Sequence, residues 1–152
     1  MRHRELLTAA AALRPPGESA QREFSAVRER VGDELALRLR RREDIARLIG
    51  GDNHRLMEHN IHNMLRFMER VFARPDAGLF VSTAAWSLQA QSAQGFRPEY
   101  WALHFGLLAD ILRETLSTRT LFETRPFLTF LSRNLRALGD PANTAGRHRA
   151  AG

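Results

Sequence analysis

Three histidines within one segment, His54, His59 and His62, are the first residues in the sequence that could do chemistry. His59 and His62 are three positions apart within the segment 53–73, so they share a face if this segment is a helix, whereas His54 points away from them. A metal site would need a third ligand from elsewhere, and the neighbouring carboxylates do not have a metal-binding spacing. We therefore expect no metal here, and we interpret the pair as polar residues at the border of a helix face or as contacts to a ligand.

A further histidine, His104, lies in a mostly apolar segment between Trp101 and Leu107. A histidine with apolar neighbours is desolvated, so it should be neutral and should need a hydrogen-bond partner. Two interpretations stay open. His104 is either a core residue bonded to a backbone carbonyl or a pocket residue that binds a carboxylate or a ring nitrogen of a ligand.

Aromatic and methionine side chains recur in three successive segments, 53–73, 79–94 and 98–117, and they could line one pocket. Trp86 and Trp101 are the largest of them. Methionine fills irregular space and suits adaptable ligand contacts. Simple core packing explains most of these residues equally well, so the pattern alone does not separate a pocket from a filled core.

All 23 basic residues are arginine, and the net charge is +6. Most arginines have acidic neighbours, which is typical of exposed helix faces with weak ion pairs. The segment 38–42 is a basic cluster, but no recognised nucleic-acid-binding module accompanies it, so we do not expect nucleic acid as a partner. Arginine binds a carboxylate through two hydrogen bonds. Arg66 and Arg97 are therefore our candidates for carboxylate-binding residues at the rim of a pocket.

Several classes of function are excluded by what the sequence lacks. It contains no glycine-rich phosphate loop, no nucleophile elbow and no carboxylate pair with catalytic spacing, so we expect no enzyme. The absence of cysteine excludes disulfides, thiolate metal sites and thioether-linked chromophores. Hydrophobic residues make up 43% of the chain, and no apolar run is long enough to cross a bilayer. We expect a soluble cytoplasmic protein without a membrane partner.

The segments that must position these residues are predicted to be helical throughout, because apolar residues recur at helical spacing and sustained alternation is absent. Asn53 and Asp76 can cap the helices that follow them. The expected helices, in chain order, are 4–13, 19 to about 49 with an interruption near Gly32-Asp33, 53–73, 79–94, 98–117, and a last one opened by Pro126.

Six or seven helices of unequal length favour an all-α, globin-like arrangement around one core with a ligand pocket over a four-helix bundle. We expect residues 1–140 to form this domain and residues 141–152 to form a flexible basic tail. Haem iron in globins is held by a histidine on the helix that 79–94 would correspond to, and this segment has none. Haem, held by a histidine from another helix, remains the alternative ligand.

A family resemblance rests on four features: GLFV at 78–81, Trp86, GFRP at 95–98, and the leucine-rich helix through 107–112. In these features residues 55–117 resemble the photoglobin-like domain. This is the globin-like, non-haem domain that precedes cobalamin-binding domains in bacterial regulators, within the superfamily of globins and phycobiliproteins. The resemblance implies a sensor or photoreceptor that holds a linear tetrapyrrole such as biliverdin. Without cysteine, the bilin would be bound non-covalently.

The resemblance also implies that light or tetrapyrrole level is the input and a conformational change is the output. The signal would pass through a homodimer or to a signalling partner protein. A ligand-free helical interaction module, in which the pocket is filled core, is a further alternative. The residues that we expect to bind the ligand are His59, His62, Trp86, Trp101 and His104, with Arg66 and Arg97 as partners of its carboxylates.

Overall fold

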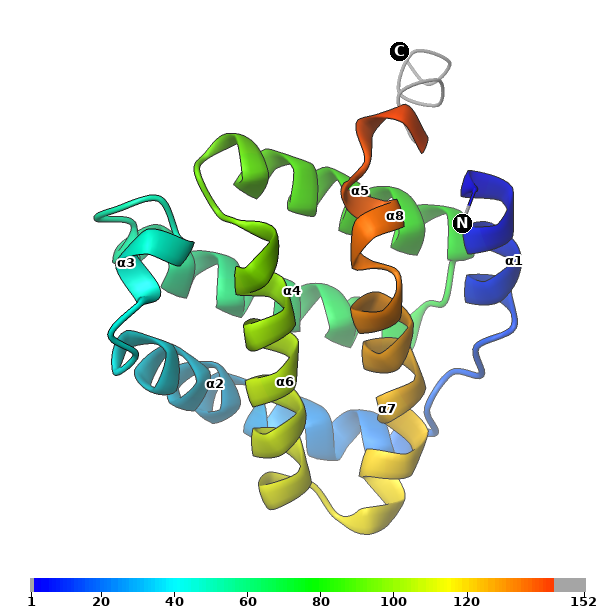
Figure 1. The fold of residues 1–152 in the computed structure, drawn as a ribbon. Helices are drawn as coiled ribbons and strands as arrows, with labels where there is room; N and C mark the ends of the chain where they lie inside the picture. The colour runs from blue at the N-terminus through cyan, green and yellow to red at the C-terminus, as the bar shows by residue number, and fades with distance from the viewer. Residues whose placement is uncertain (1, 144–152) are drawn as a thin grey trace.

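The computed structural model describes residues 2–143, and the predicted all-α, globin-like class is confirmed: the described residues form helices around one core, with no strand. Residues 144–152, most of the predicted tail, lie outside the described residues. The helices, in chain order (Figure 1), are α1 (His3–Ala11), α2 (Glu18–Arg40), α3 (Ile45–Leu48), α4 (His54–Ala73), α5 (Ala77–Ala93), α6 (Pro98–Thr115), α7 (Thr118–Arg133) and α8 (Leu135–Gly139).

Two of the predicted breaks are wrong. Helix α2 runs through Gly32 without interruption. This glycine is buried where α2 meets α4, and a Cβ atom there would lie 2.5 Å from a ring carbon of His62, so it permits a close approach instead of ending the helix. Pro126 lies inside α7, which begins at Thr118 after the cap Ser117. The proline leaves the carbonyl of Phe122 without a helical partner, and Phe122 is exposed, so water can reach that side of the helix.

The helices form two layers that cross steeply (Figure 1). Helices α2, α4 and α5 lie behind, and α6 and α7 run across them in front. Helix α2 packs against α4, α6 and α7, which makes it the link between the layers, while α5 is contacted by α1 and α8. Pairs of helices that cross in this way bury their apolar faces against several partners at once.

A chain of phenylalanine rings runs through the core and joins four helices. Phe24 of α2 meets Phe72 of α4 edge to face, with ring centroids 5.0 Å apart, and Phe72 meets Phe127 of α7 at 5.1 Å. Phe80 of α5 contacts Phe127 at 6.0 Å and Phe67 of α4 at 5.9 Å. Edge-to-face and tilted pairs of this kind stabilise the core beyond the area that they bury.

Two glycines bring the α3–α4 linker against the α5–α6 turn. Gly50 and Gly95 have φ angles of 83° and 104°, and a Cβ atom at Gly50 would lie 2.9 Å from the Cα atom of Gly95. Beside them the backbone N–H of Arg97 donates to the carbonyl of Leu48 over 2.9 Å. Only glycine combines these left-handed angles with so close a backbone contact.

His104 is a core residue in the structure, 2% exposed on α6. Its Nδ1 shares a hydrogen bond of 3.2 Å with the hydroxyl of Tyr100, and its Nε2 has no partner among the described residues. Burial raises the pKa of the Tyr100 hydroxyl and lowers the pKa of His104 to about 4. His104 is therefore neutral at pH 7, as its apolar neighbours predicted, but its partner is a side chain and not a backbone carbonyl.

Alanine at Gly50 should destabilise the fold more than alanine at the adjacent Gly51. Both glycines have positive φ, so each substitution strains the backbone by about 1–2 kcal/mol. A Cβ atom at Gly50 also collides with Gly95, whereas one at Gly51 meets nothing within 4 Å. We expect Gly50→Ala to lower the free energy of unfolding, measured in urea, by at least about 1 kcal/mol more than Gly51→Ala. Equal losses would show that the close approach contributes nothing.

The burial of His104 predicts a loss of stability at acidic pH. Its pKa is about 4 when folded and about 6.5 when unfolded, so the unfolded chain binds more protons between these values. The contribution is fully present above pH 6.5 and is lost as the pH falls towards 4. Between pH 7 and pH 5 the wild-type protein should lose about 2 kcal/mol more unfolding free energy than His104→Gln. Parallel pH profiles of the two proteins would contradict this assignment.

Candidate functional site

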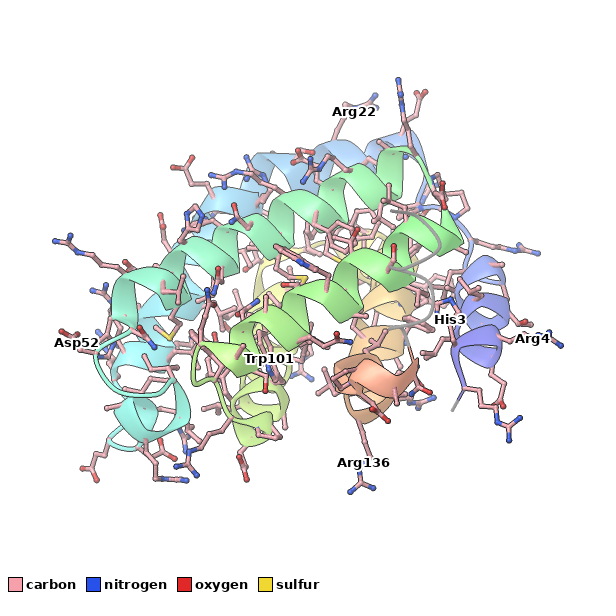
Figure 2. The ribbon with its side chains drawn as sticks, turned by 90° about the horizontal axis from the view of Figure 1, so that it is seen from above. His3, Arg4, Arg22, Asp52, Trp101 and Arg136 are labelled. Carbon is pink, nitrogen blue, oxygen red and sulfur yellow. The ribbon has the colours of Figure 1, made fainter. Side chains whose placement is uncertain are left out.

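The candidate site is a groove between α4 and α5, which run antiparallel and side by side (Figure 2). The turn 74–76 joins them at one end, where the carboxylate of Asp76 accepts from the backbone N–H of Leu79 over 2.9 Å and caps α5 as predicted. At the other end, the side-chain amide of Asn53 donates to the carbonyl of Gln94 over 3.2 Å. Between these ties the two helices do not pack closely along their length.

The first part of the groove is a hollow of about 530 Å³ near the start of α4 and the end of α5. Its size is within the range of small-molecule sites. Its walls mix aromatic, amide and hydroxyl side chains. Six of the lining residues are His59, Asn60 and Asn63 from α4 and Trp86, Ser87 and Gln91 from α5.

A second hollow of about 490 Å³ continues the groove towards the turn 74–76. The two hollows share Phe67, Arg70 and Thr83, so together they form one elongated channel along the surface. The second part is more apolar and is also lined by Arg74. Two arginines, Arg70 at the junction and Arg74 at the far end, outnumber the carboxylate of Asp76, which also lines the second hollow, so the charge of the groove is net positive.

Two large apolar side chains on α5 stay exposed where they line this groove. Trp86 lines the first hollow and Leu79 lines the second, and each is 60% exposed. Their positions, with Thr83 between them, follow the helical period and so fall on one side of α5. Exposed apolar side chains gathered along a groove are typical of binding sites.

The structure does not bring His59 and His62 together. His59 lines the groove, where its Nε2 lies 3.0 Å from the amide nitrogen of Asn63. His62 turns towards α2 instead, against Gly32, and its Nε2 lies 3.1 Å from Asp33. Residues three positions apart differ by 60° around a helix axis, and α4 has α5 on one side and α2 on the other, so this difference sends the two rings to different neighbours.

The two arginines predicted at the rim are not brought together. Arg66 is exposed beside the groove, where its guanidinium donates to the side-chain oxygen of Asn63 over 3.1 Å. Arg97 is the N-cap residue of α6, and its side chain is exposed and lines neither part of the groove. Of the two, Arg66 alone is placed near the site.

Trp101 and His104 are also separated from the groove, because α6 crosses to the front layer. Trp101 lines another hollow of about 420 Å³, which it shares with Leu88 of α5 and Arg136 of α8. Figure 2 shows Trp101 near the start of α6, with Arg136 pointing outward below α8. His104 is enclosed in the core. The single pocket expected from three successive helices is therefore divided into separate spaces.

Sequence reasoning missed most of the groove residues, among them Asn60, Arg70 and Gln91. Asn60, Asn63, Phe67 and Arg70 follow the helical period, so they form a second stripe beside the buried face of α4. That stripe was the available signal. The same pattern of residues occurs on a helix face that is exposed to water and on one that lines a groove. The sequence alone therefore did not identify these residues.

Within residues 2–143, no three histidine or acidic side chains gather in a way that could hold a metal ion. No helix in the same range has the length and apolar character to span a membrane. Comparison with known proteins gives no match: no family model fits the chain, and neither a curated protein nor a solved structure is detectably similar to it.

Proposed function

We propose that the α4–α5 groove binds an elongated, partly apolar small molecule with acidic groups, a linear tetrapyrrole such as biliverdin, without a covalent bond. The observation that carries the proposal is Trp86, a large aromatic side chain left 60% exposed on the wall of a groove. A flat conjugated ligand would stack on this ring and cover it. The chain has no cysteine, so no thioether bond can form.

The shape of the groove supports an elongated ligand. Its two parts, about 530 and 490 Å³, are joined end to end through Phe67, Arg70 and Thr83. A linear tetrapyrrole carries its carboxylates on its inner rings, away from its ends. Arg70, at the junction of the two parts, is placed to bind such a group with two hydrogen bonds, and Arg66 lies close by as a second cation.

The packing of α4 and α5 supports a sensory role. Helix α4 packs on α2, whereas α5 is contacted by α1 and α8. A ligand that changed the spacing of α4 and α5 would therefore shift α1 and α8 relative to α2. Such a shift alters the surface of the domain, and a second copy of the chain or a signalling partner would recognise the altered surface.

Haem is the second candidate, and His59 is the observation that favours it. This histidine lines the groove on α4, and its Nε2 lies near the side-chain amide of Asn63. Helix α5 carries no histidine, so a histidine ligand for iron in the groove would come from α4. The two candidates differ in their absorption spectra.

Co-expression with haem oxygenase, followed by purification and absorption spectroscopy, tests the proposal. We expect a red-absorbing band from bound biliverdin in the wild-type protein. Trp86→Ala should weaken biliverdin binding by about tenfold or more, because the stacking surface is lost, with little change in stability because the side chain is exposed.

Phe122→Ala is the matched control. Phe122 is 71% exposed on α7 and lines neither part of the groove, so this variant should bind biliverdin as tightly as the wild-type protein. A sharp Soret band in place of the red band would replace biliverdin with haem. A colourless wild-type protein would leave the helical interaction module as the remaining function.

A further inference from the structure

A glutamine at the base of the α4–α5 groove holds a hydrogen-bond acceptor that nothing in the described residues satisfies. Gln91 is 5% exposed and lines the first hollow. Its Nε2 donates to the hydroxyl of Ser87 over 2.8 Å, which leaves Oε1 buried without a partner within residues 2–143. An unpaired buried acceptor costs free energy, because in the unfolded chain water would donate to it.

Asn60 holds the matching group on the opposite wall. It lines the same hollow from α4, and its Nδ2 is buried with no partner in the part of the chain that the structure describes. The terminal torsions of asparagine and glutamine are broad, so a small rotation presents these amides to the space between the helices. The two walls thus offer one free donor and one free acceptor, since every side-chain amide carries both kinds of group.

We infer that this part of the groove recognises a lactam or another cyclic amide edge of its ligand. The ligand N–H donates to the amide oxygen of Gln91, and the ligand C=O accepts from the amide nitrogen of Asn60. A lactam is the chemistry that fits, because it carries a donor and an acceptor side by side on a flat, otherwise apolar ring. A carboxylate would satisfy Asn60 but would oppose the oxygen of Gln91.

The amides of Asn60 and Gln91 and the guanidinium group of Arg70 together determine the direction in which the ligand lies in the groove. Asn60 and Arg70 are ten residues apart on α4, which is about 15 Å along the helix axis. The lactam end therefore lies near the start of α4, and the acidic group lies at the junction of the two hollows. This inference rests on the proposed function, because a linear tetrapyrrole has lactams at its ends and carboxylates nearer its middle.

Two ligands and two variants separate the amide contact from the carboxylate contact. Purified wild-type protein, Gln91→Met and Arg70→Gln are each titrated with biliverdin and with biliverdin dimethyl ester, which keeps the lactams and lacks the carboxylates. We expect Gln91→Met to weaken the binding of both ligands by about tenfold, because methionine fills the space without an amide. Arg70→Gln should weaken the acid and leave the binding of the ester unchanged.

The stability of the unliganded protein, measured as its urea midpoint, tests whether Gln91 has a structural role instead. Gln91→Met removes an unpaired acceptor, which raises stability, and the hydrogen bond to Ser87, which lowers it, so its urea midpoint should stay close to the wild-type value. Gln89→Met is the matched control on the same helix. Gln89 donates to the carbonyl of Leu138 over 3.1 Å and does not line the groove, so this variant should lower the midpoint and leave binding unchanged.

Three outcomes would overturn the inference, and they are distinguishable. Wild-type affinity of Gln91→Met for both ligands would show that the amide takes no part in binding, while the proposed function stands. A loss of stability in Gln91→Met as large as that in Gln89→Met would assign the amide a structural role. Failure of the wild-type protein to bind either ligand would remove the proposed function and the lactam contact together.

Discussion

The backbone contact between Gly50 and Gly95 is the constraint on which the arrangement of α4 and α5 depends. It fixes the linker before α4 against the turn after α5, and the short turn 74–76 joins the same two helices at their other ends. Helices tied at both ends keep their relative position without close packing between them, because the ties replace the contacts that would otherwise set the distance. The groove lies where the two helices of this hairpin have few contacts with each other apart from the ring pair Phe67–Phe80.

Most of the helices could be predicted from the sequence because their signals are local. The aspartate that caps α5 acts within a few residues, and α4, α5 and α6 begin and end close to the expected ranges 53–73, 79–94 and 98–117. Gly32 was misread because its role depends on a distant neighbour, a histidine of another helix. Pro126 was misread because a proline is tolerated inside a helix where the carbonyl one turn earlier lies on an exposed side, and the exposure of Phe122 is decided by the fold.

The candidate site was predicted only in part, for the same reason. His59 and Trp86 come from adjacent antiparallel helices, so a local pattern was enough to bring them to one groove. Trp101 and His104 lie away from the groove because they are on α6, and the direction of α6 is set by its packing on α2 and α7. Long-range packing also decides which polar stripe of α4 is exposed to water and which faces α5. For this reason Asn60 and Arg70 were not predicted as site residues.

The contrast between the two tryptophans gives the protein an internal optical reporter. Trp86 is 60% exposed on the groove, Trp101 is 6% exposed elsewhere, and the sequence contains no other indole. A water-soluble quencher should therefore reduce mainly the fluorescence of Trp86 in the groove. The fluorescence of Trp101, near α8, is shielded from it. A molecule bound in the groove will shield Trp86 from the quencher and leave the fluorescence of Trp101 unchanged. Occupancy of the groove can therefore be followed in the unlabelled protein.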